Sequence, residues 1–318
     1  NVDISLHGGE PLLLRIKLFK KYIYLIKNEL KDLNYTIGLQ SNGLLITDEF
    51  LDFFKEEAIS IGISCDGPPK VNDKNRYYHN GKGSGLKLEK VLYKLQNNNI
   101  FAGILAVIDI TENPLEVWHY LASFSPPVVD FLLPHGHHDK LPQKKTFENK
   151  IYGDWMIKIF DDWFAKRVHQ EIRIRFFEEI IYRLFGKEGS LESLGIDPVG
   201  LITISTDGNY ELVDTMKSVH EKAQVLNLNI WEHSLNDVLN HNAVAKRQNG
   251  IETLSKKCKS CSVVNVCGGG YLPHRFSRID DYKNPSVYCK DLYILINHIE
   301  TQVSKSLAKK YVHENEQR

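Results

Sequence analysis

The sequence has no excess of charge of either sign, since its 318 residues include 40 Lys and Arg and 40 Asp and Glu. A neutral chain has no overall field to attract nucleic acid or an anionic membrane, so neither is expected as a partner. The sequence also has no apolar run near the ~20 residues that span a bilayer, and no signal-peptide layout at its beginning. Internal repeats and low-complexity tracts are absent as well. We therefore expect a cytoplasmic protein.

Cysteine is scarce, and its placement is uneven. One cysteine is Cys65, and the other four crowd the last fifth of the chain as Cys258, Cys261, Cys267 and Cys289. A secreted disulfide framework would distribute its bridges through a small domain, whereas clustered thiols in an intracellular protein more often hold a metal. The isolated Cys65 ends an apolar run, and a single small apolar residue there is expected to pack in the core.

Short apolar runs alternate with amphipathic segments in the first part of the chain. Each run ends in a polar or glycine-rich turn, as in YTIGLQ before Ser-Asn-Gly and ISIGIS before Cys-Asp-Gly-Pro. Strands that alternate with helices predict an α/β fold with a parallel sheet, and its active face is expected at the carboxyl ends of the strands. Five strands are expected, at Val2–Leu6, at Ile59–Ser64, and in runs that start at Tyr35, Phe101 and Val128.

The remainder of the chain changes character. Two helices rich in aromatic residues are expected between about Thr146 and Phe185, with those aromatics packed as core against the sheet. The stretch ITISTDGNYELVD places two alternating runs around Asp207-Gly208-Asn209, which predicts a hairpin. A final helix is expected from Asp291. The length fits roughly two domains of ~150 residues each.

The carboxyl-terminal cysteines follow the pattern Cys-x2-Cys-x5-Cys, with Cys289 as a later fourth member. Four thiolates complete either a tetrahedral zinc site or a 4Fe–4S cluster. Gly268, Gly269 and Gly270 follow directly, and they let backbone N–H groups come close to the sulfides of a cluster. The five-residue step is mildly against zinc, but the spacing by itself leaves zinc and iron–sulfur both open.

These motifs together resemble radical S-adenosylmethionine (AdoMet) enzymes with a carboxyl-terminal SPASM domain, over most of the chain. The family's Gly-Gly-Glu-Pro turn, whose groups hold the AdoMet amino group, matches residues 8–11, and its Ser-x-Asp-Gly-Pro motif matches SCDGP from Ser64. A loop arginine follows in the family, and the Ser and Arg positions are used around the AdoMet ribose and carboxylate. The cofactor-binding residues that the resemblance implies are His7, Gly8, Gly9, Glu10, Ser41, Asn42, Ser64, Asp66 and Arg76.

The resemblance implies a partial (β/α)6 barrel that misses its first strand and is joined to a SPASM domain. Four segments are expected: a partial barrel at 1–140, a helical connection at 141–200, the SPASM domain at 201–290, and a helix with a tail at 291–318. In the family, the loop after the first strand carries Cys-x3-Cys-x2-Cys, which binds the 4Fe–4S cluster that cleaves AdoMet. The printed sequence lacks this motif, so we expect a truncated chain that is unable by itself to start the radical reaction. That second cluster is expected only where the missing segment is present.

The same resemblance implies one auxiliary 4Fe–4S cluster with four ligands, Cys258, Cys261, Cys267 and Cys289. Full SPASM domains hold a second auxiliary cluster, but two of its cysteine positions are occupied here by Val213 and Tyr271. In sulfatase-maturing members, an Asp that follows the first of these positions works as a base. Asp214 stands there and is the candidate catalytic residue.

A finer resemblance is to maturases that build three-residue cyclophanes in ribosomally made peptides, the FxsB, XyeB and GrrM-like group. The stretches DFLLPHGHHD, TDGNYELVDTMK, CGGGYLPHRFS and NPSVYCKDL are similar to that group's signatures. The resemblance implies an oxidoreductase-type enzyme that joins an aromatic ring carbon to the β-carbon of a residue two positions along. Its partners would be a ribosomal precursor peptide and an external electron donor such as flavodoxin or ferredoxin.

Two other functions stay open. One is a different radical reaction on peptides, such as epimerisation or thioether formation, and the other is a non-catalytic peptide-binding module that holds zinc or a cluster. Among the remaining polar residues, His135, His137 and His138 are expected to form a rim around a substrate mouth rather than a metal tract. His274 and Arg275 are expected to anchor the loop that follows the cysteines.

Overall fold

The computed structural model describes residues 1–96, 98–143, 146, 148–166, 171–198, 200–248 and 250–316. They form two compact units. The first, called the sheet unit, consists of Asn1–Leu132 and Asp162–Arg175, and the second, called the cysteine unit, of Leu133–Asp161 and Phe176–Arg318. Each unit is therefore discontinuous in sequence, whereas the sequence suggests consecutive segments.

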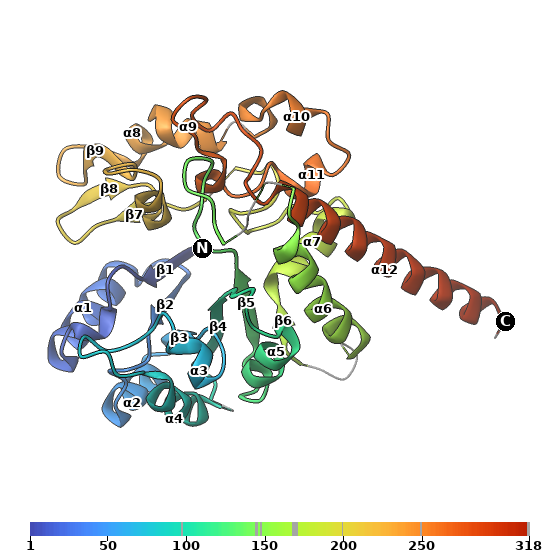
Figure 1. The fold of residues 1–318 in the computed structure, drawn as a ribbon. Helices are drawn as coiled ribbons and strands as arrows, with labels where there is room; N and C mark the ends of the chain where they lie inside the picture. The colour runs from blue at the N-terminus through green and yellow to red at the C-terminus, as the bar shows by residue number, and fades with distance from the viewer. Residues whose placement is uncertain are drawn as a thin grey trace. The chain divides into compact units, whose positions relative to one another are not determined.

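The sheet unit is built on a parallel sheet of six strands in the order β1-β2-β3-β4-β5-β6 (Figure 1). Neighbouring strands are consecutive in sequence and parallel, so each connection crosses over in the same sense. This is the α/β fold with a partial (β/α)6 barrel that the sequence predicts. The strands are β1 Val2–Leu6, β2 Tyr35–Ser41, β3 Ser60–Ser64, β4 Phe101–Val107, β5 Val128–Leu132 and β6 Arg173–Ile174.

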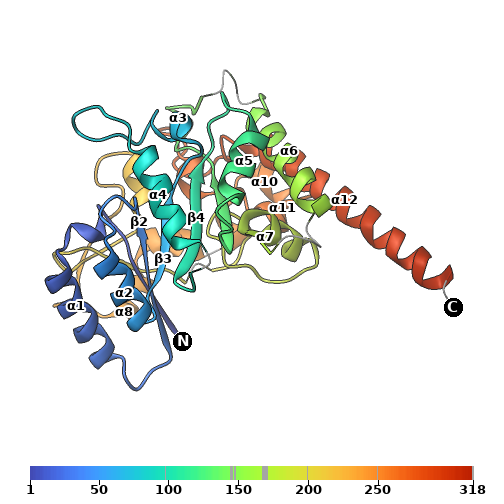
Figure 2. The same ribbon diagram turned by 90° about the horizontal axis from the view of Figure 1, so that it is seen from below.

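Helices of the sheet unit cover one face of the sheet, as expected for crossovers of one sense, and Figure 2 shows α1, α2, α4 and α5 in this layer. Phe19 of α1 packs edge-on against Phe50 of α2, with ring centroids 5.7 Å apart. Thr47 caps α2, because its hydroxyl accepts the Phe50 N–H. The helices are the 3-10 turn η1 Pro11–Leu13, α1 Ile16–Glu29, α2 Asp48–Glu56, α3 Pro69–Asn72, α4 Gly85–Leu95 and α5 Pro114–Ala122.

The sixth strand, β6, is a strand that the sequence does not predict. It consists of Arg173 and Ile174 alone, which pair with Val128 and Val129 of β5. The next residue, Arg175, donates from Nε (2.9 Å) and Nη2 (2.5 Å) to one carboxylate oxygen of Asp130. Two residues are too few for a periodic pattern, so this strand depends on pairing with β5 and not on local sequence.

The cysteine unit contains a three-stranded antiparallel sheet in the order β7-β8-β9. The predicted hairpin is present, with its turn at Gly208, where a φ of +80° favours glycine. The third strand, β9, is an addition to the predicted pair. Helix α6 belongs to both units, because its last residues are part of the sheet unit. The elements of the cysteine unit, with α6, are α6 Ile151–Lys166, α7 Arg175–Leu184, β7 Thr203–Ile204, β8 Asn209–Glu211, η2 Asp214–Ser218, β9 Val225–Asn229, α8 Leu235–Leu239, α9 Asn242–Gln248, η3 Gly250–Thr253, α10 Lys256–Lys259, α11 Val264–Cys267, η4 Leu272–Arg275 and α12 Cys289–Glu316.

The aromatic residues of α6 and α7 are core residues, as the sequence predicts. Phe160 and Phe177 are fully buried, and their rings meet edge to face at 5.4 Å. A buried carboxylate then joins α6 to α12, because Asp291 Oδ1 accepts the N–H groups of Tyr152 and Gly153, each at 3.0 Å. An anion at the amino-terminal turn of a helix is favoured by the helix dipole, so Asp291 fixes α12 to the start of α6.

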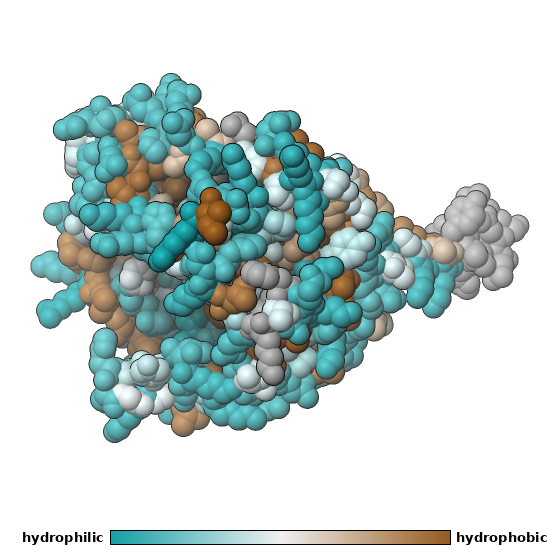
Figure 3. All heavy atoms as spheres, turned by 45° about the horizontal axis from the view of Figure 1, so that its top comes forward, coloured by the Kyte–Doolittle hydropathy of each residue, from teal (hydrophilic) through white to brown (hydrophobic). Residues whose placement is uncertain are grey.

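The face shown in Figure 3 is mostly hydrophilic, and its hydrophobic residues lie in small separate groups. Over the described residues, every helix is too short or too polar to traverse a lipid bilayer.

Candidate functional site

A glycine turn follows β1 at the carboxyl edge of the sheet. Gly8 has a φ of +102°, which other residues rarely adopt. A Cβ added at Gly8 or Gly9 would meet no atom of the protein within 4 Å, so the backbone of this turn is open on that side. The resemblance assigns the AdoMet amino group to this turn, and its exposed backbone is compatible with a polar ligand.

The Glu10 carboxylate links the glycine turn to the end of β2. Its Oε1 accepts the Leu12 N–H (3.1 Å) and the Ser41 hydroxyl (2.8 Å), and its Oε2 accepts the Asn42 N–H (2.9 Å). Ser41 is buried, and its Oγ also accepts the Gly43 N–H at 3.0 Å. The structure thus brings three of the implied residues together and gives Glu10 a positioning role between two loops.

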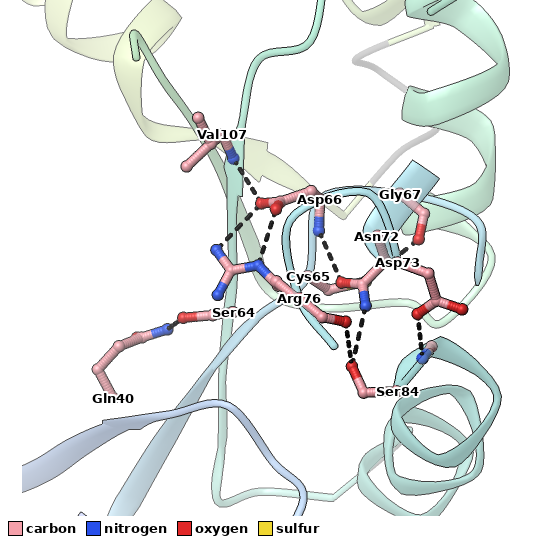
Figure 4. A network of polar contacts seen from close by, with 11 residues as sticks. Gln40, Ser64, Cys65, Asp66, Gly67, Asn72, Asp73, Arg76, Ser84 and Val107 are labelled. Carbon is pink, nitrogen blue, oxygen red and sulfur yellow. Dashed lines mark hydrogen bonds and ion pairs between the residues drawn. The ribbon is translucent and has the colours of Figure 1, made fainter. Parts of the chain in front are cut away.

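Asp66 and Arg76 form a forked ion pair beyond the end of β3 (Figure 4). Arg76 donates from Nε to Oδ2 at 2.7 Å and from Nη2 to Oδ1 at 3.1 Å, and Oδ1 also accepts the Val107 N–H at 2.9 Å. Asp66 is 6% exposed, so the carboxylate is held in a nearly dry place. Two parallel hydrogen bonds fix the plane of a guanidinium, which gives Arg76 a defined orientation.

The loop that carries Arg76 is tied back by a chain of polar contacts, also drawn in Figure 4. Ser84 donates its hydroxyl to the Arg76 carbonyl at 2.7 Å and accepts from the Asn72 amide at 3.4 Å. Asn72, which is fully buried, also accepts the Asp66 N–H at 3.4 Å. The implied residues Asp66 and Arg76 therefore sit on a loop that the protein itself holds in place.

Ser64 has a partner that the sequence analysis missed. Gln40 of β2 donates its amide to the Ser64 hydroxyl at 3.0 Å, as Figure 4 shows. The Gln40 side chain lies against Gly62 of β3, where a Cβ would clash with the Gln40 amide. A glycine inside a strand marks such a close approach, so Gly62 is the signal that could have indicated a residue crossing from the neighbouring strand.

Cys65 is a packing residue, in agreement with the sequence analysis. It is 2% exposed, and its thiol donates to the Gly67 carbonyl at 3.5 Å. Burial raises the pKa of this thiol to about 12, so it stays protonated at neutral pH.

The four carboxyl-terminal cysteines line one cavity of about 430 Å³ in the cysteine unit. Cys258 lies on α10, whose cap Ser255 accepts the Cys258 N–H at 3.2 Å, and Cys267 is the last residue of α11. Cys289 begins α12 and so comes to the same cavity from a separate element. The glycines after Cys267 all have positive φ, which turns the chain back over the cavity.

The donor set can be tested against a single ion and against a cluster. A zinc ion needs sulfurs at ~2.3 Å from one point. Within the described residues, however, no group of three or more His, Cys, Asp or Glu is arranged to hold one metal ion. The cysteines instead surround a space. Burial is the largest cause that raises the pKa of Cys267 to about 12, and the charges of Cys289 and Cys258 are the next largest. This arrangement of four thiols around one cavity fits a larger group with several metal atoms, such as the implied 4Fe–4S cluster.

Positions implied for a second auxiliary cluster are part of an apolar core. Val213 is 7% exposed and belongs to a cluster of buried residues with Met216 and Leu272. The Tyr271 ring packs against this cluster, and its hydroxyl bonds the Thr215 hydroxyl.

Asp214, the candidate base, follows Val213 as the first residue of η2 and is exposed. Its negative charge acts on His135: desolvation lowers the pKa of His135, and Asp214 partly offsets this effect. The two side chains therefore lie in one neighbourhood of the cysteine unit.

The expected histidine rim is wrong for His137. His137 is 7% exposed and packs edge-on against Phe276, with ring centroids 5.6 Å apart. His138 is half-buried, and its Nε2 bonds the Pro285 carbonyl at 2.8 Å, so it fastens one loop to another. Of the three, His135 alone is exposed, and it lies near Asp214, the candidate base.

No family model matches the sequence. Among curated proteins, it is similar to a cysteine-type anaerobic sulfatase-maturating enzyme of Clostridium novyi, with 23% identity over 312 residues that cover 91% of this chain and 78% of the relative. A serine-type anaerobic sulfatase-maturating enzyme of Bacteroides thetaiotaomicron is 24% identical over 317 residues, covering 92% of this chain and 74% of that protein.

The fold is similar to that of solved structures. Native anSMEcpe with bound AdoMet superposes with a TM-score of 0.82 at 21% sequence identity, over 96% of this chain and 83% of that one. Streptococcus suis SuiB superposes with a TM-score of 0.60 at 16% identity, over 90% of this chain and 66% of that one. The α/β fold with a parallel six-stranded sheet is thus the radical SAM/SPASM-type fold that the sequence predicts.

Proposed function

We propose that this chain belongs to a radical AdoMet enzyme that modifies a ribosomally made peptide by joining an aromatic ring carbon to a β-carbon. The observation that carries the proposal is the set of four cysteines around one cavity, in a fold shared with anSMEcpe. Solved structures of similar fold add support, since anSMEcpe has been solved with AdoMet and a Cp18Cys peptide, and SuiB with the precursor peptide SuiA. The cyclophane product rests on the sequence resemblance.

The sheet unit would bind AdoMet at the carboxyl edge of β1 to β4. The open backbone at Gly8 and Gly9 offers polar groups to the amino group, while Glu10 keeps the two neighbouring loops in register. Arg76, oriented by Asp66, can direct its charge at the AdoMet carboxylate, and Ser64 lies beside Gln40 for the ribose hydroxyls. The protein's own hydrogen bonds hold these groups in position, which reduces the ordering that binding requires.

The cysteine unit would hold one auxiliary cluster through Cys258, Cys261, Cys267 and Cys289. AdoMet and iron–sulfur clusters supply, when bound, the radical that removes a hydrogen atom and the acceptor for one electron. Formation of the carbon–carbon bond breaks one C–H bond at the β-carbon and one at the ring, so the peptide loses two hydrogens. The ring hydrogen leaves as a proton, and Asp214 is proposed to accept it, with His135 beside it as a second polar group.

The cluster can be tested on the 318-residue chain itself. After reconstitution with iron and sulfide under anaerobic conditions, we expect about one 4Fe–4S cluster per chain, a brown protein, and loss of the cluster in Cys258→Ala. Cys65→Ala is the matched control, because this buried thiol lies in the sheet unit and should leave the iron content unchanged. Stoichiometric zinc with a colourless protein would contradict the proposal and favour the zinc-binding module.

The reaction can be tested by expressing the complete open reading frame that contains these residues with short open reading frames from its genomic neighbourhood. Mass spectrometry should then find a peptide that has lost two hydrogens and that carries the link on an aromatic residue. Epimerisation would leave the mass unchanged, and a thioether would protect a cysteine from alkylation. Oxidation of a single Cys or Ser side chain would instead favour a sulfatase-maturating activity, as named for the relatives.

A further inference from the structure

Arg275 is a buried cation with neutral hydrogen-bond partners. It is 4% exposed, and it donates from Nη2 to the Thr253 carbonyl at 2.9 Å and from Nε to the Tyr282 carbonyl at 3.1 Å. Both acceptors are backbone oxygens, and among the described residues no carboxylate pairs with this guanidinium. These bonds confirm that Arg275 anchors its loop. They leave its charge without an anion in a place where an uncompensated charge is costly.

The sulfurs of the cysteine cavity are candidates for that anion. A point beside Gly269, where a Cβ would stand, lies 3.7 Å from Cys258 Sγ and 3.8 Å from Arg275 Nε. Gly269 has a φ of +79° and no side chain, so nothing from this residue separates the two groups. Burial lowers the pKa of Arg275, and Cys258 and Cys267 oppose this shift, which places both sulfurs within electrostatic reach.

We infer that Arg275 is the built-in counter-cation of the iron–sulfur cluster held by Cys258, Cys267 and their partners, and that its charge raises the reduction potential of that cluster. The inference rests on the proposed function, because it takes the cluster as the bound group. A cluster with four thiolates gains negative charge when it is reduced. A positive charge fixed nearby in a medium of low dielectric stabilises the reduced state more than the oxidised state.

Other cations near the cavity lie in a different environment. Lys257 and Lys290 also line it, but Lys257 is exposed and the Lys290 Nζ is 3.2 Å from the exposed Glu148 carboxylate. Water and salt screen charges in such positions. Arg275 therefore differs from its neighbours in burial, and Lys257 offers a control with the same charge on the same cavity.

The test compares the potentials of reconstituted proteins. The wild type, Arg275→Gln, Arg275→Lys and Lys257→Gln are loaded with iron and sulfide, their iron and sulfide contents are measured, and each cluster is titrated potentiometrically with detection by electron paramagnetic resonance. At a potential equal to the wild-type midpoint, the ratio of reduced to oxidised cluster in Arg275→Gln should be about tenfold lower than in the wild type. This ratio corresponds to a midpoint potential that is about 59 mV lower for a one-electron couple. Arg275→Lys, which keeps the charge, and Lys257→Gln should stay close to the wild type.

Each result has a distinct meaning. Equal potentials for Arg275→Gln and Lys257→Gln at full cluster content would overturn the inference and leave the proposed function intact. If Arg275→Gln fails to retain a cluster, Arg275→Lys decides: retention at the wild-type potential supports a role of the charge, whereas loss in both variants shows a role of shape and overturns the inference. Zinc in place of iron in the wild type would overturn the proposed function and this inference with it.

Discussion

At the scale of single residues, carboxylates of the sheet unit hold loops in position. Asp66 receives three hydrogen bonds, two from Arg76 and one from the Val107 N–H, and it does so while nearly excluded from water. Glu10 likewise receives three, from groups of two different loops. Removal of such a residue should weaken binding at a neighbouring site through the groups that it orients.

Asp66→Asn is expected to destabilise the sheet unit by about 3 kcal/mol, because it leaves the Arg76 charge without its anion. AdoMet affinity should fall at least about tenfold, since the guanidinium loses its fixed orientation. Urea unfolding and calorimetric titration with AdoMet measure the two effects. The control is Asp48→Asn, whose carboxylate is exposed and pairs with Lys94 on the surface at 2.6 Å, and which should change stability by less than about 1 kcal/mol. Unchanged AdoMet affinity in Asp66→Asn would remove Arg76 from the proposed site.

His274 gives a prediction about pH. It is 3% exposed, its ring lies between Tyr271 and Tyr288, and its Nε2 has no hydrogen-bond partner among the residues that the structure describes. Burial, and secondly His135, lower its pKa from 6.5 to about 3. Between pH values of about 3 and 6.5, the unfolded chain binds a proton at His274 that the folded chain does not bind. The contribution of neutral His274 to the free energy of unfolding is therefore fully present above pH 6.5 and declines as the pH falls.

From pH 7 to pH 5, the free energy of unfolding of the wild type should therefore fall by about 2 kcal/mol more than that of His274→Phe. At pH 7, the variant should be at least as stable as the wild type, because phenylalanine fills a similar space and buries no unpaired nitrogen. Urea unfolding of the metal-free protein at the two pH values provides the measurement. Identical pH dependence of the two proteins would show that His274 is accessible to protons in the folded state.

At the scale of elements, a short helix with a side-chain cap carries Cys258. Ser255→Ala removes the cap of α10, which should cost about 1 kcal/mol and weaken retention of a reconstituted cluster about fivefold. The rate at which a chelator removes iron measures this effect. Ser234→Ala is the matched control, since Ser234 caps α8 in the same way, far along the chain from the cysteines. It should lower stability by a similar amount and leave iron retention unchanged, so equal rates for the two variants would contradict the prediction.

Much of this element order could be predicted from the sequence, and the misses have common causes. Alternating runs that end in glycine turns, such as Ile59–Ser64, indicate β strands by a local pattern. The two-residue β6 has no such pattern, and it exists because β5 offers an unpaired edge. β9 was also missed, since Val225–Asn229 is a half-exposed strand that follows a polar turn.

The candidate site could be predicted to a similar extent. The spacing of Cys258, Cys261 and Cys267 indicates a metal centre, and the structure adds that Cys289 reaches the same cavity from α12. The neighbourhood of Arg275 could not be predicted, because it depends on the left-handed turns of three successive glycines. Gln40 was missed for a similar reason, as its partner Ser64 belongs to another strand.

At the scale of the whole molecule, the chain passes from one unit to the other after Leu132, after Asp161 and after Arg175. The segment Asp162–Arg175, in which the chain returns to the sheet unit, supplies polar partners to buried residues of that unit. Asp162 accepts the indole N–H of the fully buried Trp118 at 3.1 Å, and Arg175 pairs with the buried Asp130. Residues 1–140 by themselves therefore lack the polar partners that Trp118 and Asp130 find in the segment Asp162–Arg175.

A fragment of residues 1–140 is accordingly expected to be less stable than a fragment of residues 1–175. The shorter one loses the hydrogen bond from the Trp118 indole to Asp162 and the ion pair of Asp130 with Arg175, and each loss costs about 1–3 kcal/mol. Thermal unfolding followed by circular dichroism compares the two fragments, with Arg175→Gln in the longer one as an intermediate case. Equal melting temperatures would show that residues 1–140 are a self-sufficient domain, as the sequence first suggests.

The interlaced course of the chain also has a genetic consequence. Because α6 starts with residues of the cysteine unit and its last residues belong to the sheet unit, no single crossover between two related genes can exchange one unit whole. A recombination event before the codon for Ile151 would pair strands β1 to β5 with a foreign α6 and β6, and one beyond the codon for Arg175 would keep them together. Natural chimaeras of such proteins should therefore carry their breakpoints beyond the codon for Arg175, where the cysteine unit continues without interruption.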